Sequence, residues 1–192
     1  METIIQNIIE ENNRRNKEIY ARFDPVKGIG SIGERVKVYI DDFPIPLQYI
    51  PVEMMKVPFI KRLVKCGSIE SFLKTIGPIE SSEYEGDRIK VISQFVRIRC
   101  KFDFPFWAAT FVYIKNKGGG EDVLFRLTRP QRRFVERLEV LRKANKPIRI
   151  VLLKARQWGG STTSQIYMAW LQLVHKVGLN SLIIAHQGAG SD

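Results

Sequence analysis

A short glycine-containing segment near the end of the chain combines the residue types that bind phosphate. Gly159 and Gly160 free the backbone for a turn, and the hydroxyl residues that follow them can cap a helix. Because a helix N-terminus presents N–H groups and positive dipole charge, it favours an anion, and basic residues precede the glycines. The spacing departs from the usual loop G-x-x-x-x-G-K-[ST], since Ala155 replaces its first glycine and Gly160 replaces its lysine. The candidate nucleotide-binding residues of this segment are Lys154, Ala155, Arg156, Gln157, Trp158, Gly159, Gly160, Ser161 and Thr162.

The residues on both sides of this segment predict the elements that would position it. Residues 148–153 are mostly apolar and β-favouring, which predicts a strand buried on both faces. Residues 162–176 carry apolar side chains at helical spacing, and residues 181–186 predict a second short buried strand. This order of strand, loop and helix indicates an α/β fold. An ordinary Gly-Gly turn would give the same order, but it would not need basic and hydroxyl residues around it.

Three features further upstream have simple structural interpretations. Residues 1–23 predict a helix whose apolar stripe folds back on its own domain. Residues 28–33 match G-x-G-x-x-G, but strand-type alternation follows them instead of a helix, so we interpret them as a flexible loop and not as a dinucleotide site. Residues 110–114 and 123–127 predict the two strands of a hairpin.

The positive charge of the chain is strong and unevenly distributed. The formal net charge is +11, and residues 126–156 contain eleven Lys or Arg residues against two Glu residues. This distribution indicates an anionic partner such as nucleic acid or a nucleotide. The two cysteines and two histidines lack the spacing of a zinc site, and no apolar run is long enough to span a bilayer. The composition therefore argues against zinc-binding and membrane-spanning classes.

The string from Lys154 to Thr162 resembles the altered phosphate loop of the large terminase subunits of tailed phages, which are ATP-driven motors that package DNA. An Asp-Phe-Pro-Phe-Trp string at residues 103–107 and an Ala-His-Gln string at residues 185–187 are also similar to terminases. The resemblance implies a partial P-loop NTPase sheet of the RecA/ASCE type in residues 87–192. A mostly helical N-terminal region in residues 1–86 would precede it.

The same resemblance implies ATP and Mg²⁺ as cofactors and assigns roles to individual residues. Lys154 would be the displaced phosphate-loop lysine, and Ser161 would supply the hydroxyl on the Mg²⁺ side. Arg156 is a candidate catalytic arginine finger. Either Lys154 or Arg156 would neutralise the terminal phosphates.

Gln131 has two interpretations that the sequence leaves open. Thr128 followed by Gln131 fits a capping box, in which the glutamine side chain bonds to the backbone at the start of a helix. The resemblance to terminases instead implies that Gln131 reads the adenine edge, because an amide can donate to N7 and accept from the amino group at once.

Motors of this type also need a second strand that ends in Asp-Glu, which orders Mg²⁺ and activates the attacking water. No such pair follows Gly159, and the nuclease carboxylates of terminases are absent, so we interpret the chain as an N-terminal fragment that is inactive alone. In the complete protein, the resemblance implies an ATPase that moves double-stranded DNA and also carries a nuclease domain. It implies a portal protein and a small terminase subunit as partners, an oligomer on the portal, no membrane contact, and a place in the host cytoplasm.

Two alternative functions remain from the sequence. One is another P-loop motor, such as a helicase-like ATPase. The other is a basic module that binds DNA or RNA without hydrolysing nucleotide, for which a steep salt dependence of binding is expected.

Overall fold

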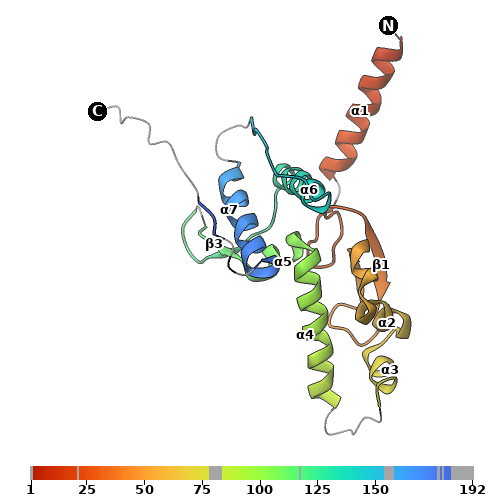
Figure 1. The fold of residues 1–192 in the computed structure, drawn as a ribbon. Coiled ribbons are helices and arrows are strands. Elements are labelled where there is room, and N and C mark those ends of the chain that lie inside the picture. The colour runs from red at the N-terminus through yellow and green to blue at the C-terminus, as the bar shows by residue number, and fades with distance from the viewer. Residues whose placement is uncertain are drawn as a thin grey trace.

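The structure of the chain is a computed structural model that describes residues 2–20, 22–77, 84–116, 118–153, 158–176, 178 and 180–182, without the side chains of residues 2 and 14–20. Figure 1 shows α1 (Glu2–Tyr20) projecting from the rest of the molecule. The elements that follow it in the first half of the chain are β1 (Arg35–Tyr39), β2 (Leu47–Pro51), the 3₁₀ helix η1 (Val52–Lys56), α2 (Pro58–Cys66), α3 (Ile69–Lys74) and α4 (Tyr84–Phe102).

The second half of the chain is mostly helical in the residues that the structure describes. It contains α5 (Phe104–Phe111), β3 (Tyr113–Ile114), β4 (Val123–Leu124), α6 (Arg129–Lys143), α7 (Gly160–Trp170) and the π-helical turn η2 (Leu171–His175). The predicted hairpin is confirmed, because β3 pairs antiparallel with β4. Its paired strands are shorter than the sequence indicated. No helix in the described ranges is both long and apolar enough to cross a bilayer.

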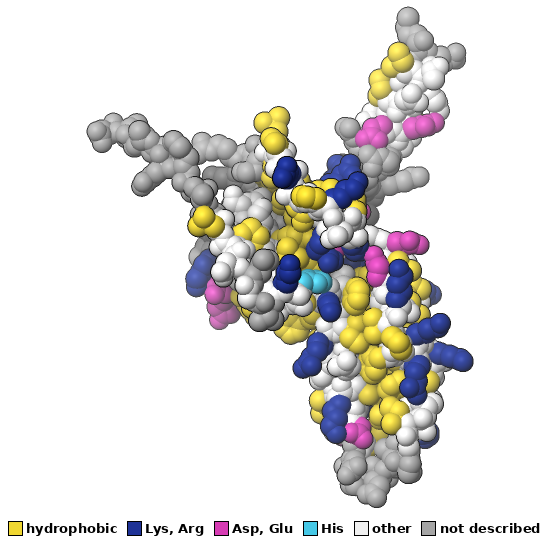
Figure 2. Space-filling view, viewed as in Figure 1, with side chains coloured by type: hydrophobic (Ala, Val, Ile, Leu, Met, Phe, Trp, Pro, Cys, Tyr) yellow, Lys and Arg dark blue, Asp and Glu magenta, His cyan; other side chains and the backbone are white. Residues whose placement is uncertain are grey.

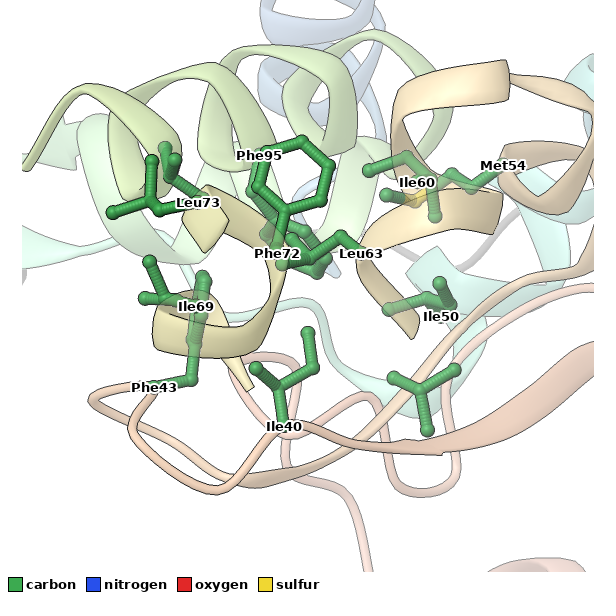
Figure 3. Packing of buried hydrophobic residues seen from close by; sticks show 12 residues of the cluster. Ile40, Phe43, Ile50, Met54, Ile60, Leu63, Ile69, Phe72, Leu73 and Phe95 are labelled. Atoms are coloured by element: carbon green, nitrogen blue, oxygen red, sulfur yellow. The ribbon is translucent and has the colours of Figure 1, made fainter. Parts of the chain in front are cut away.

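The hydrophobic core is divided into two clusters that part at the end of α4. The first cluster lies between the β1–β2 hairpin, α2, α3 and α4 (Figure 3), and it includes the pair of Phe43 and Phe95, with ring centroids 4.7 Å apart. The second cluster joins α5, α6 and α7 around Phe104 and Trp170, whose ring centroids are 5.4 Å apart. The expected boundary between residues 86 and 87 falls inside α4, whereas the clusters separate between Phe102 and Phe104.

Asp103 stands at this separation and is completely buried. Its carboxylate accepts two hydrogen bonds from Arg35, at 2.8 and 2.9 Å, and one from Arg99 at 3.2 Å. The same carboxylate accepts from the Phe106 N–H and so caps the start of α5. One negative charge thus connects β1, α4 and α5.

Arg99 is 1% exposed, and its remaining donors also have partners. It donates to Gln48 Oε1 at 2.7 Å and to the Pro25 carbonyl oxygen at 3.3 Å, and its guanidinium lies 4.0 Å from the Phe106 ring centroid. Burial lowers the pKa of Arg99, and the charge of Asp103 opposes this change. The arginine can remain buried because every part of it is either paired or stacked.

The glycine loop at residues 28–33 is packed against the body of the protein, which corrects the expectation of a flexible loop. Gly28 and Gly30 have positive φ angles of 80° and 61°. A Cβ on Gly28 would lie 1.9 Å from the Tyr49 carbonyl oxygen, and one on Gly30 would lie 2.3 Å from that of Arg22. The extended strand β1 follows the loop, as the sequence predicted. The glycines here permit close backbone contact.

Two further expectations are wrong in the described structure. Residues 148–153 form no strand, because no described segment pairs with this backbone. The segment is not buried either, since Val151 and Leu153 are fully exposed. The apolar stripe of α1 does not fold back: Ile4 and Ile8 are 64% and 56% exposed. The described residues contain two small antiparallel sheets, so the expected P-loop NTPase sheet is not among them.

The end of η2 holds a half-buried histidine. His175 meets the Trp170 ring edge-on at 4.4 Å, and the Trp170 Nε1–H donates to the Cys100 carbonyl oxygen at 2.8 Å. Burial, and then the nearby charge of Arg142, lower the pKa of His175, with a smaller opposing effect from Glu139. The folded protein therefore favours the neutral imidazole.

We expect Asp103→Ala to reduce the free energy of unfolding by about 3–5 kcal/mol, because it leaves two buried guanidinium groups without their shared carboxylate. Asp103→Asn keeps the side-chain size and the helix cap and should lose less. Asp87→Ala is the matched control, since Asp87 pairs with Lys90 on the surface, and its effect should stay within about 0.5 kcal/mol. Urea unfolding of the three variants measures this difference. Equal losses for Asp103→Ala and Asp87→Ala would contradict the role given to Asp103.

We expect His175 to make the protein less stable in acid. Since the pKa of His175 is lower in the folded state than in the unfolded state, the unfolded chain takes up the proton first, and stability falls as the pH drops through about 6.5. His175→Phe should lose less thermal stability than the wild type between about pH 7.5 and about pH 5.5. Melting temperatures of both proteins across this range provide the test, and identical slopes would show that His175 does not contribute.

Candidate functional site

The N-termini of α6 and α7 are joined by one buried glutamine. Gln131 is 5% exposed, and its Nε2 donates to the carbonyl oxygens of Trp158 and Gly159 at 3.2 and 3.5 Å. Its Oε1 accepts from the Thr128 N–H at 2.7 Å, which confirms the predicted capping box. Gln131 therefore connects the first turn of α6 to the residues that begin α7, although Trp158 lies 27 positions later in the chain.

Gly159 has the backbone conformation and the close neighbour that require glycine. It precedes the first residue of α7 with φ 81° and ψ 21°, in the left-handed region. A Cβ at this position would lie 2.5 Å from Gln131 Nε2. Both the φ angle and the contact with the glutamine therefore disfavour any side chain here.

The hydroxyl residues at the start of α7 divide into two pairs. Thr163 Oγ1 donates to the Gly159 carbonyl oxygen at 2.8 Å, and Ser164 Oγ donates to the Gly160 carbonyl oxygen at 3.0 Å. Ser161 and Thr162 are exposed, and within the described residues their hydroxyl groups make no hydrogen bond. Only the first pair in sequence, Ser161 and Thr162, is thus available to a ligand.

Within the residues that the structure describes, no side chain caps the first N–H groups of α7. The Thr163 N–H is already bonded to the Gly159 carbonyl oxygen at 2.9 Å, and Gly159 itself has no side chain that could accept from the others. The N–H groups of residues 160–162 therefore lie at the positive end of the α7 dipole. Such an arrangement attracts an anion.

The structure brings only part of the predicted site together. Residues 158–162 lie at the start of α7 and Gln131 contacts them from α6, but residues 154–157, with the predicted Lys154, Ala155, Arg156 and Gln157, lie outside the described residues. The described part contains no group of three or more His, Cys, Asp and Glu residues that could hold a metal.

A large groove lies beside this helix start, between α6 and the extended residues 149–153. Its volume is about 810 Å³, and Trp158 forms part of its floor. The Trp158 ring meets Phe134 edge-on, with ring centroids 6.0 Å apart. Figure 2 shows basic side chains around exposed hydrophobic ones in this region. We call it the arginine groove, after the four arginines among its lining residues, which are Arg129, Arg133, Arg137 and Arg149.

The sequence did not reveal this groove. Phe134 and Leu141 are only half-buried and line the groove, and the buried apolar positions of α6 are Val135 and Leu138. The available signal was the interval of four between successive arginines, which places Arg133 and Arg137 on one helix face.

Comparison of the chain with protein-family models, with curated proteins and with solved structures finds no match.

We expect Gly159→Ala to destabilise the start of α7 more than Gly178→Ala. Both glycines have a φ angle above 80°, but a Cβ on Gly178 meets no atom within 4 Å. Gly178→Ala should therefore cost about 1 kcal/mol for the backbone alone, and Gly159→Ala about 2–3 kcal/mol because it also displaces Gln131. Chemical unfolding gives both values. Indistinguishable losses would contradict the close contact between Gly159 and Gln131.

Proposed function

We propose that the start of α7 binds the phosphates of ATP with Mg²⁺. The observation that carries this proposal is an uncapped helix N-terminus that Gln131 holds in place through the carbonyl oxygens of Trp158 and Gly159. Backbone N–H groups that are already aimed at one point need no rearrangement when an anion arrives. The basic residues nearby favour a nucleotide over a neutral ligand.

Three side chains have proposed roles around these N–H groups. Ser161 would bind Mg²⁺ through its exposed hydroxyl, which uses no protein partner in the described residues. Lys154 and Arg156 would neutralise phosphate charge, with Arg156 stabilising the charge that develops on the transferred phosphoryl group.

Gln131 positions the loop in this proposal. Both atoms of its amide already have protein partners, at Thr128 on one side and at Trp158 and Gly159 on the other. An adenine edge would have to replace these hydrogen bonds. The carbonyl oxygens of Trp158 and Gly159 would then lose their bonds to Gln131. Because both atoms of the amide are already bonded, the role of positioning the loop fits Gln131 better than direct contact with adenine does.

The resemblance of residues 154–162 to terminase loops extends the proposal to a larger protein. We propose that the chain is the ATP-binding part of a terminase large subunit, a viral motor ATPase that moves double-stranded DNA. Hydrolysis would depend on carboxylates that order Mg²⁺ and activate water, and on assembly as an oligomer at a portal with a small subunit, in the host cytoplasm. A nuclease domain would belong to the same large subunit.

We expect a fluorescent ATP analogue to bind the chain saturably in the presence of Mg²⁺, and Lys154→Ala and Ser161→Ala each to weaken binding by about tenfold or more. Each variant has a matched control. Ser164→Ala removes a hydroxyl that bonds to the Gly160 carbonyl oxygen and faces no ligand, and Lys115→Ala removes a lysine that pairs with Asp122 on the β3–β4 hairpin. Both controls should bind as the wild type does.

Fluorescence titration measures these affinities, and circular dichroism verifies that each sample is folded. Absence of binding by folded wild-type protein would contradict the proposal. So would equal binding by all four variants, because the nucleotide would then lie elsewhere.

A further inference from the structure

The arginine groove has charge of one sign around an apolar floor. Arg129, Arg133 and Arg137 follow one another at intervals of four residues along α6, and Arg149 lines the groove from the extended segment. No carboxylate is among the described residues that line it. The charged side chains among these lining residues are therefore all positive, although Arg129 and Arg133 also have other interactions within the structure.

The acidic residues of α6 face another part of the molecule. Glu136 and Glu139 line a separate cavity of about 80 Å³. Glu139 accepts hydrogen bonds from Arg142 at 2.7 Å and from the Tyr167 hydroxyl at 2.6 Å. Glu139 is therefore paired with Arg142, outside the groove, and among the described residues no contact links either glutamate to Arg137 or Arg149.

Two of the groove arginines are available to a partner. Arg137 and Arg149 are both exposed, and in the ranges that the structure describes neither side chain makes a hydrogen bond or an ion pair. Guanidinium groups bind carboxylates and phosphates through paired N–H donors, so both residues can receive an anion without breaking an existing contact.

The floor of the groove exposes several large apolar side chains. Val140 is 52% exposed, Ile150 and Leu152 are each 39% exposed, and Leu153 is fully exposed. Removing apolar surface from water is favourable, so these side chains can stabilise a bound partner. A contiguous apolar surface inside a groove, with a charged border, is typical of a site that binds another molecule.

We propose that the arginine groove binds an acidic amphipathic helix of a partner protein. The partner would place its apolar face on the floor and its carboxylates against the arginines. Arg137 borders the groove on α6 and Arg149 borders it on the extended segment, so carboxylates on both borders of the partner's apolar face would each meet one available arginine. This inference does not depend on ATP binding at the start of α7.

Two other anionic partners fit the groove less well. The guanidinium groups of Arg137 and Arg149 come from two different elements and match separate carboxylates, whereas the phosphates of one nucleotide are compact. A nucleic-acid duplex presents phosphates to arginines, but its backbone would leave the apolar floor in contact with water. The combination of floor and charge is what favours an amphipathic protein segment.

The test uses a designed, fluorescein-labelled peptide of about 18 residues that forms a helix with a leucine face and glutamates on its borders. Fluorescence anisotropy with the whole chain, in the absence of nucleotide, should show saturable binding. Arg137→Glu and Arg149→Glu should each weaken it by about tenfold through charge reversal, and Leu152→Ser by several-fold through loss of floor contact. Lys61→Glu reverses an exposed charge on α2, outside the groove, and should leave binding unchanged.

Two results would overturn the proposal. Equal binding by a peptide of the same composition, scrambled so that its leucines share no face, would reduce the interaction to net charge. Alternatively, a DNA duplex could displace the designed peptide and respond to Arg137→Glu but not to Leu152→Ser, which would assign the groove to nucleic acid. Because all of the substituted residues are exposed, circular dichroism should show the wild-type fold in each variant.

Discussion

The Asp103 carboxylate receives hydrogen bonds from two buried guanidinium groups at the point where α4 ends and α5 begins. Because α4 packs in the first cluster and α5 in the second, the position of one cluster relative to the other depends on this contact. Arg35 extends the contact to the β1–β2 hairpin, where it also donates to the Tyr49 carbonyl oxygen at 3.0 Å. A buried charge network is costly when incomplete, so its complete pairing favours one arrangement of the two clusters over others.

At the candidate site, the buried amide of Gln131 likewise holds two elements in a fixed relative position. Gln131 is satisfied by the backbone at the starts of two helices, and this fixes Gly159 in the left-handed conformation from which α7 begins. A second contact also holds the two helices together, since the Tyr167 hydroxyl on α7 donates to Glu139 on α6. The N–H groups of the helix start therefore have a defined direction before any ligand binds, which is the property that an anion site requires.

Local sequence patterns predicted the elements that depend on neighbouring residues. The capping box at Thr128 and Gln131, the helix of residues 2–20 and the pairing of β3 with β4 all follow from short-range rules. The patterns failed where an element needs a distant partner. Residues 148–153 have the composition of a buried strand, but a strand forms only when another strand accepts its hydrogen bonds, and no described segment does so. The stripe of Ile4 and Ile8 likewise indicated burial, but apolar spacing does not specify the surface that would cover it.

The sequence by itself determined the glycines and hydroxyl residues at the start of α7, the excess of positive charge in residues 126–156, and the presence of a capping glutamine. These are properties of composition and of spacing within a few residues. Only the tertiary structure decided that Gln131 reaches Trp158, that Arg129, Arg133 and Arg137 line one groove while Glu136 and Glu139 line another cavity, and that Asp103 joins Arg35 to Arg99. Two of these features are contacts between residues that are remote in the chain, and the third is the orientation of α6 against its neighbours. Both kinds of feature depend on packing in three dimensions.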